Sequence, residues 1–218
     1  MAIRKLAGYA GIGIEYTQTK NPFFEALVLE NMRKIEQLKT GKTLLQLIAQ
    51  AKPKTRDKNF PVGVNVVFRP PFEKILSAPG MKRSFAGGMR LDDPVKYDAW
   101  KNKNQGQLIP TLGAKTSAEP TTKQGGAEHS PSVGCTCWVN YSNIEILSKD
   151  GTWHVPHIAM AHEMIHCWHS LNGLSNPDMR QEEYQTVGIK GFDSLPVTEN
   201  KIRFESGIQL RTKYFADD

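Results

Sequence analysis

Apolar residues recur every three to four positions early in the chain, which is the spacing of one face of a helix. The pattern predicts a helix from Asn21-Pro22 to Gly41, because Asn caps a helix well and Pro fits its first turn. A second helix is predicted over residues 43–51. We expect the two helices to form an antiparallel pair joined by a tight turn at Thr40-Gly41.

Runs of β-branched and aromatic residues predict strands. The clearest are residues 62–68 and 137–141, with a shorter one at 144–146 and an early strand or extended arm at 8–16. Between them, residues 69–133 hold many Pro and Gly residues and long polar stretches. We expect a large loop region there, with short strands near Ile109 and Leu112.

The second half of the chain predicts three further helices. The strongest begins at Val155-Pro156 and ends at Asn172-Gly173; the others span residues 179–187 and 199–206. Strands followed by helices favour an α+β fold. With 218 residues, we expect one domain over 21–218, preceded by a poorly ordered N-terminal arm at 1–20.

Composition and charge narrow the class of protein. Hydrophobic residues make up 39% and charged residues 23%, which is typical of a globular protein, and no apolar run is long enough to insert into a membrane. The net charge is +6, with the densest basic cluster at Lys52, Lys54, Arg56 and Lys58. Because no basic run is interleaved with aromatic residues, we expect no nucleic-acid partner.

Three cysteines, Cys135, Cys137 and Cys167, are too few for a disulfide framework. The C-x-C pair could clamp a metal, but a thiolate site needs more ligands than the chain supplies. We therefore expect reduced thiols that behave as small buried hydrophobic groups.

The main candidate chemistry lies in the helix predicted over 155–173, which contains the motif H-E-x-x-H. Positions i and i+4 lie one above the other, so His162 and His166 can bind one metal ion while Glu163 reaches a metal-bound water. This combination predicts a zinc peptidase. The alternative is two ordinary histidines on a helix.

A catalytic zinc needs a third protein ligand. The metzincin pattern fails, because His169 stands where it needs Gly and Asn172 where it needs His. The gluzincin pattern takes a Glu from a later helix, and both Glu182 and Glu183 fit. Helical phase favours Glu183, which leaves Glu182 as a second carboxylate behind the ligands or in solvent; a plain exposed acidic pair is the alternative.

His169 has three possible roles. It lies one turn beyond His166, where it could support a metal ligand, donate to a substrate or simply favour the negative end of the helix.

An ordered set of motifs resembles the NleD-like family of bacterial type III effector zinc metalloproteases. The resemblance covers most of residues 20–215 and leaves 99–133 unmatched. It rests on the H-E-x-x-H helix, an E-E segment ending in T-V-G, an E-N-x-x-R segment and a later R-x-x-Y; these are residues 162–166, Glu182-Glu183 with Thr186-Val187-Gly188, Glu199-Asn200 with Arg203, and Arg211 with Tyr214.

This resemblance implies a zincin-like domain with Zn²⁺ as cofactor, its H-E-x-x-H helix packed beside a small sheet. It implies an endopeptidase injected by a type III system into a host cell, where family members cleave stress-activated MAP kinases in the activation loop and suppress immune signalling. The first fourteen residues lack acidic side chains, as in an N-terminal secretion signal, and have no secretory h-region.

In the expected mechanism, Glu163 accepts a proton from the attacking water and passes it to the leaving amine. The family pattern makes Tyr214 and Arg211 candidates for stabilising the oxyanion, or else anchors of the C-terminal segment. Arg203 would contact a partner or form a salt bridge. We expect an extended substrate to bind beside an edge strand at 135–141.

Two other functions share parts of this sequence evidence. One is a non-catalytic basic binding protein with a structural or absent zinc site. The other is a cytoplasmic peptidase that acts on proteins of its own cell.

Overall fold

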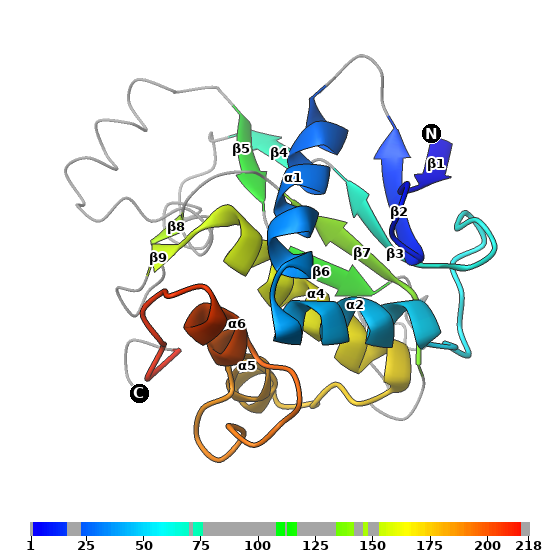
Figure 1. The fold of residues 1–218 in the computed structure, drawn as a ribbon. Coiled ribbons are helices and arrows are strands. Elements are labelled where there is room, and N and C mark those ends of the chain that lie inside the picture. The colour runs from blue at the N-terminus through cyan, green and yellow to red at the C-terminus, as the bar shows by residue number, and fades with distance from the viewer. Residues whose placement is uncertain are drawn as a thin grey trace.

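A mixed sheet and five helices form the described part of the chain (Figure 1). The structure is a computed structural model. It describes residues 2–16, 23–69, 72–75, 108–111, 113–116, 134–141, 146–147 and 153–214.

The sheet has five strands in the order β1-β2-β3-β7-β6. The strands β2, β3 and β7 are parallel to one another, and the edge strands β1 and β6 are antiparallel to their neighbours. Their bounds are Ala2–Lys5 (β1), Gly11–Tyr16 (β2), Val64–Arg69 (β3), Gly113–Thr116 (β6) and Cys137–Asn140 (β7). Two further antiparallel pairs join β4 (Phe72–Ile75) to β5 (Leu108–Thr111) and β8 (Ile146–Leu147) to β9 (Trp153–His154).

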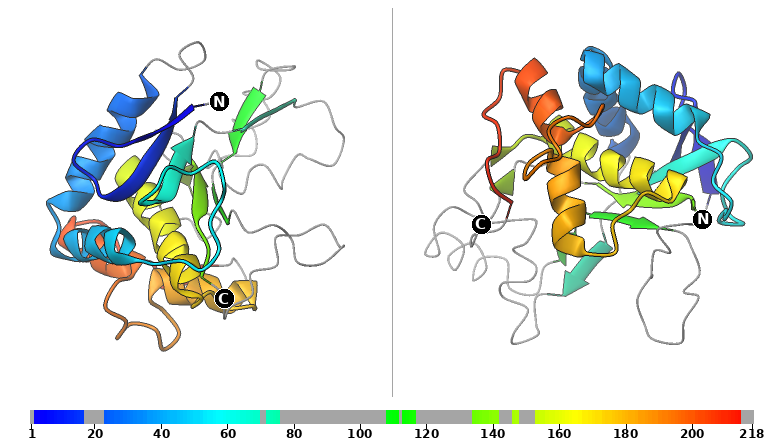
Figure 2. Two further views of the ribbon diagram at one scale, coloured as in Figure 1. Left: turned by 90° about the vertical axis from the view of Figure 1, so that its right-hand side faces the viewer. Right: turned by 90° about the horizontal axis from the view of Figure 1, so that it is seen from below.

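Three helices cover one face of the sheet, and two more pack on the far side of the third (Figure 2). The covering helices are α1 (Phe24–Glu36), α2 (Lys39–Gln50) and α4 (Pro156–Asn172). Helices α5 (Met179–Val187) and α6 (Glu199–Glu205) contact α4 from the C-terminal side. The fold is therefore α+β, with α4 between the sheet and the C-terminal helices.

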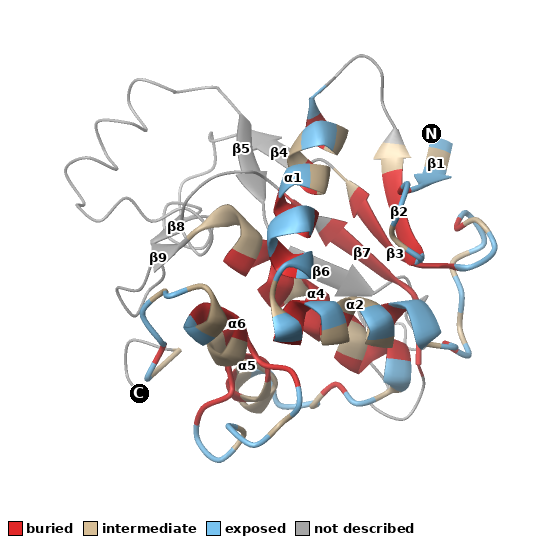
Figure 3. Cartoon of the chain, in the orientation of Figure 1, coloured by how far each residue is buried: buried red, intermediate tan, exposed pale blue. Residues whose placement is uncertain are grey.

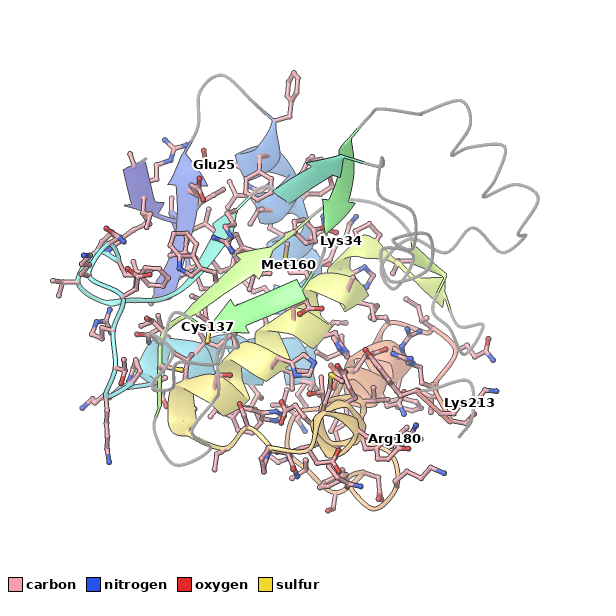
Figure 4. All side chains as sticks on the ribbon, turned by 180° about the vertical axis from the view of Figure 1, so that it is seen from behind. Glu25, Lys34, Cys137, Met160, Arg180 and Lys213 are labelled. Atoms are coloured by element: carbon pink, nitrogen blue, oxygen red, sulfur yellow. The ribbon has the colours of Figure 1, made fainter. Side chains whose placement is uncertain are left out.

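The core lies between the sheet and its helices. Alternate residues of β2, β3 and β7 point to the same face and meet α1, α2 and α4, because successive side chains of a strand alternate between faces. Figure 4 places Cys137 and Met160 where α4 meets the sheet. Fully buried members include Ile12, Ile14, Met32, Ile48, Val66, Phe68, Val139, Ile158, Met164 and Ile165.

Helix α4 is buried on almost every side (Figure 3). It begins with Pro156 in its first turn and ends at Gly173, whose φ of +66° is the left-handed conformation that stops a helix. These are the ends that the sequence predicts. No helix in the described ranges is long and apolar enough to cross a membrane.

Residues 2–5 and 11–16 are strands of the sheet, which corrects the expectation of a poorly ordered arm for this part of residues 1–20. Residue 1 and residues 17–20 lie outside the described ranges. Strand β1 pairs with β2, and β2 pairs with β3. Ile12 and Ile14 of β2 are each 1% exposed, so this segment contributes directly to the core. The early strand predicted within 8–16 is confirmed as β2.

The turn predicted at Thr40-Gly41 is also wrong. The chain turns at Gln37 and Leu38, and Thr40 and Gly41 lie in the first turn of α2. The carboxylate of Glu205 accepts hydrogen bonds from the backbone N and Oγ1 of Thr40, which caps the helix from a distant part of the chain. Helix α2 crosses the end of α1 and does not run antiparallel to it (Figure 1).

The segment expected to be an edge strand is internal. Strand β7 pairs with β3 on one side and β6 on the other, so its backbone is not available to a substrate. The neighbouring edge strand is β6, which also contacts α4. The Asn21-Pro22 cap, most of the predicted 69–133 loop and part of the 144–146 strand lie outside the described residues.

Candidate active site

Two imidazole nitrogens and one carboxylate oxygen meet beside α4. The Nε2 atoms of His162 and His166 lie 3.1 Å apart, as one helical turn between them allows. Oε2 of Glu183, from the facing helix α5, lies 3.2 Å from Nε2 of His162 and 3.3 Å from Nε2 of His166. Each pair of these atoms is within hydrogen-bonding distance, although they belong to two helices.

The opposite nitrogen of each ring faces a different carboxylate. Nδ1 of His162 lies 2.7 Å from Oε2 of Glu199, and Nδ1 of His166 lies 2.9 Å from Oε1 of Glu182. An ionised carboxylate only accepts hydrogen bonds, so each ring carries a hydrogen on Nδ1, and this is its only hydrogen when the imidazole is neutral. The Nε2 lone pairs are then directed at each other and at the Glu183 carboxylate.

This donor set fits a small divalent cation. Zinc binds His nitrogen and carboxylate oxygen at about 2.0–2.1 Å, which in a tetrahedron places neighbouring ligand atoms about 3.3 Å apart. The three distances among the Nε2 and Oε2 atoms are 3.1, 3.2 and 3.3 Å. Two lone pairs and a carboxylate repel one another at this distance unless a proton or a metal ion lies between them. His162, His166 and Glu183 can therefore hold a metal.

Electrostatics at the site follow from its carboxylates. Burial lowers the pKa of His162, but hydrogen bonds to Glu183 and Glu199 outweigh it and raise the pKa to about 9. Burial likewise opposes the charged form of His166, yet the charge of Glu183 and the hydrogen bond to Glu182 raise its pKa well above the ordinary value. In the metal-free chain, protons therefore occupy the position that suits a cation.

Glu199 is a completely buried carboxylate at the start of α6. Besides His162, it pairs with the guanidinium of Arg203, one turn later, and lies 3.5 Å from Nη1 of Arg211. Both arginines are buried as well, at 0% and 3% exposed. Of its two predicted roles, Arg203 therefore has that of a salt-bridge partner, since its buried side chain does not face the surface.

The Arg211-Tyr214 segment lies beside His162. The ring of Tyr214 stacks on that of His162, with centroids 5.9 Å apart and planes 12° apart. The Arg211 guanidinium lies 4.3 Å from the centre of the Tyr214 ring, and paired hydrogen bonds of 2.8 Å with Asn200 hold its backbone. Burial and the charge of Glu183 raise the pKa of Tyr214 well above its usual value, so the hydroxyl stays protonated.

Glu163 is half-buried and follows His162 on α4. Its negative charge contributes to the raised pKa of both His166 and Tyr214, so the Glu163 carboxylate lies close enough to interact with both side chains. Glu182, by contrast, lies behind His166, where it accepts hydrogen bonds from Nδ1 of His166 and of His169. Burial raises the pKa of Glu182, but these bonds outweigh it and lower the pKa to about 2.

The T-V-G segment closes α5 against the site. Oγ1 of the buried Thr186 lies 3.1 Å from Nδ1 of His166. Gly188 ends α5 with φ at +83°, and a Cβ there would lie 2.6 Å from Thr198, the residue that caps α6 before Glu199. Sequence reasoning gave Thr186 and Glu199 no role of their own, although the family motif contains both.

The three thiols lie in the core as predicted. Cys135, Cys137 and Cys167 are free and buried. Burial and the neighbouring thiol of Cys137 raise the pKa of Cys167 well above its ordinary value, which disfavours the thiolate that metal binding requires.

A family model described as "Effector protein" for peptidase family M91 matches residues 13–214. The chain belongs to the M91 peptidase family. The match includes every site residue described above, from His162 to Tyr214. No curated protein sequence matches this M91 protein.

Solved structures with a related arrangement include two botulinum neurotoxin light chains. The serotype F light chain of Clostridium botulinum is 14% identical with a TM-score of 0.47, over 76% of this chain and 39% of that one. The type G light chain is 12% identical with a TM-score of 0.42, over 74% and 43%. The M91 protein thus spans about two fifths of their length.

Proposed function

We propose that this M91 protein is a zinc endopeptidase with a gluzincin arrangement, delivered by a type III system into a host cell, where it cleaves stress-activated MAP kinases in the activation loop. The observation that carries the catalytic part is the meeting of two Nε2 atoms and one carboxylate oxygen at 3.1–3.3 Å. Membership of a peptidase family described as effectors supports it. The resemblance to NleD-like proteases supports the substrate and the route of delivery.

His162, His166 and Glu183 would hold the metal, and Glu182 and Glu199 would orient the two rings through Nδ1. When bound, zinc would polarise the scissile carbonyl and lower the pKa of a water molecule towards neutrality. In this assignment Glu183 binds the metal, and Glu182 and Glu199 each hold one histidine ring.

The remaining site residues have roles in proton transfer and charge stabilisation. Glu163 accepts the proton of the attacking water and later gives it to the leaving amine. The Tyr214 hydroxyl, which its raised pKa keeps protonated, donates a hydrogen bond to the developing oxyanion. Arg211 is buried against Glu199 and the Tyr214 ring, so its role is to position Tyr214.

An exposed basic segment supports an acidic or phosphorylated protein partner. Lys52, Lys54, Arg56 and Lys58 are all exposed, and Lys52 and Arg56 line a hollow of about 610 Å³ at the end of α2. The one acid in this stretch, Asp57, is occupied by hydrogen bonds from Trp138 and Asn59. The positive charge of the segment is therefore available for long-range attraction.

The test is to incubate the zinc-loaded protein with purified stress-activated MAP kinases and to map new chain termini by mass spectrometry. We expect one cleavage in the activation loop, and none with Glu163→Gln, which removes the proton acceptor without removing a ligand. A zinc-loaded protein that leaves the kinases intact would overturn the substrate assignment. A chain that binds no stoichiometric zinc would overturn the enzyme itself and favour a basic binding protein.

Delivery is tested separately. Residues 1–50 fused to a reporter should enter host cells only from bacteria with a working type III apparatus. Failure of translocation alongside kinase cleavage in vitro would favour a peptidase that acts in its own cell.

A further inference from the structure

Glu182 has both carboxylate oxygens occupied by donors. Oε1 lies 2.9 Å from Nδ1 of His166 and 2.8 Å from Nδ1 of His169, and Oε2 accepts a 2.7 Å hydrogen bond from the backbone N of Asn176. Three donors from three positions fix the carboxylate in one orientation. The His169 bond is therefore part of what points Glu182 at His166.

His169 is itself well suited to a positioning role. It is 0% exposed, so it does not face a substrate. Nδ1 contacts Glu182 and Nε2 lies 3.5 Å from Nε2 of Gln185, so both ring nitrogens meet side chains of α5. A buried imidazole loses its hydration on folding, and these contacts replace it.

The geometry around His166 shows why a fixed Glu182 matters. Nδ1 of His166 has a second neighbour, Oγ1 of Thr186 at 3.1 Å, so a rotation of the ring can direct its Nδ1 hydrogen at either acceptor. Glu182 also precedes Glu183 on the same helix, and its carboxylate would compete for the metal position if it could rotate. A donor that holds Oε1 at Nδ1 prevents both changes.

We propose that His169 is a positioning residue that fixes Glu182 and, through it, the ring of His166. The inference rests on the proposed function, because it concerns how tightly His166 binds zinc. A competing possibility is a second cation site, since ligand atoms of His166, His169 and Glu182 lie within 4.8 Å of one another. We favour hydrogen bonds, because the Nδ1 atoms of His166 and His169 both lie at hydrogen-bonding distance from the same oxygen, Oε1 of Glu182.

The test compares two substitutions of His169 in the full chain. His169→Phe keeps a planar ring without a donor, whereas His169→Asn places an amide donor near the position of Nδ1. Zinc affinity is measured by competition with a chromophoric chelator, zinc stoichiometry by metal analysis, and stability by the Tm of the metal-free protein. We expect His169→Phe to raise the zinc Kd about tenfold, as loss of a supporting hydrogen bond does elsewhere, and His169→Asn to restore most of the affinity.

His157 is the matched control. It lies in the first turn of the same helix, is half-buried, and contacts Ser206 rather than the site. His157→Phe should therefore leave the zinc Kd unchanged.

Three results would overturn the inference while leaving the enzyme intact. These are an unchanged zinc Kd in His169→Phe, an equal loss of affinity in His169→Phe and His169→Asn, and two zinc ions per wild-type chain that fall to one in His169→Phe. A wild-type chain without zinc would instead refute the proposed function.

A measurement on the unaltered protein covers the case in which His169→Phe does not fold. Nitrogen-15 NMR of the histidine side chains should show a slowly exchanging hydrogen on Nδ1 of His169 in the zinc-bound protein. A ring without a hydrogen on Nδ1 would overturn the inference.

Discussion

Nδ1 of His162 lies 2.7 Å from Oε2 of Glu199, although 37 positions separate the two residues in the chain. The contact joins the H-E-x-x-H helix to the E-N-x-x-R helix. It also ties the orientation of a metal-binding ring to a buried ion pair, because Glu199 holds Arg203 with its other oxygen.

Glu199→Gln tests this coupling. It keeps the shape of the side chain but leaves Arg203 buried without a counter-charge, so the unfolding free energy of the metal-free protein should fall by about 3–5 kcal/mol. The zinc Kd should rise about 10- to 100-fold. Chemical denaturation and chelator competition measure the two effects.

Glu205→Gln is the control for that experiment. Glu205 caps α2 through Thr40, away from the site, so its loss should lower stability by about 1–3 kcal/mol without changing zinc affinity. If Glu199→Gln behaved in the same way, the link between the ion pair and the metal ligand would be wrong.

Zinc binding should release protons at neutral pH. His162 has a folded pKa of about 9 and that of His166 is also raised, against about 6.5 for an unfolded histidine. Histidine pKa values that are raised by folding stabilise the metal-free fold below pH 6.5, and this stability is lost as the pH rises towards 9. Zinc affinity should increase over the same interval, because the ligands must be neutral.

Calorimetry in buffers of different ionisation enthalpy counts the released protons, and thermal unfolding follows the pH dependence. A metal-free Tm that climbs between pH 6.5 and 9 would contradict the assigned protonation.

Tyr214→Phe should reduce kcat by about 100- to 1,000-fold, because the oxyanion loses a hydrogen-bond donor. The zinc Kd should not change, since Tyr214 stacks on His162 through its ring, which Phe retains. Tyr9→Phe loses a hydrogen bond to Glu36 outside the site and should leave kcat unaltered. A parallel fall of kcat and zinc affinity in Tyr214→Phe would assign the hydroxyl to the support of Glu183 in the metal site and not to the oxyanion.

The basic segment should speed capture of a whole protein substrate. Replacing Lys52 and Lys58 together by Glu should lower kcat/KM for an intact kinase about tenfold at low salt, and leave cleavage of a short peptide unchanged. Lys39→Glu with Lys42→Glu makes the same charge change at the other end of α2, a helix about 18 Å long. Equal effects of the two double variants would mean that only net charge matters.

Local signals explain what the sequence predicted well. Pro156 and Gly173 fix the ends of α4, and the helical phase that favoured Glu183 over Glu182 agrees with the distances from Glu183 to the two histidines. Helix α5 has the predicted bounds because Asp178 caps it and Gly188 ends it. In each case the information lies within a few residues of the element.

Long-range contacts explain what the sequence did not predict. The start of α2 depends on Glu205, which follows Thr40 by 165 positions, and the internal place of β7 depends on pairing with β3 and β6. The N-terminal segment is held in place by β3, from which it is separated by two helices. Periodicity carries no information on such partners.

The separation of His162 from Glu199 also affects how the protein matures. During synthesis the histidines leave the ribosome before α6 exists, so a nascent chain presents His162 without the Glu199 carboxylate that orients its ring. On the proposed mechanism, the protein reaches its full zinc affinity, and gains the Tyr214 hydroxyl, only when residues beyond 198 have folded onto α4.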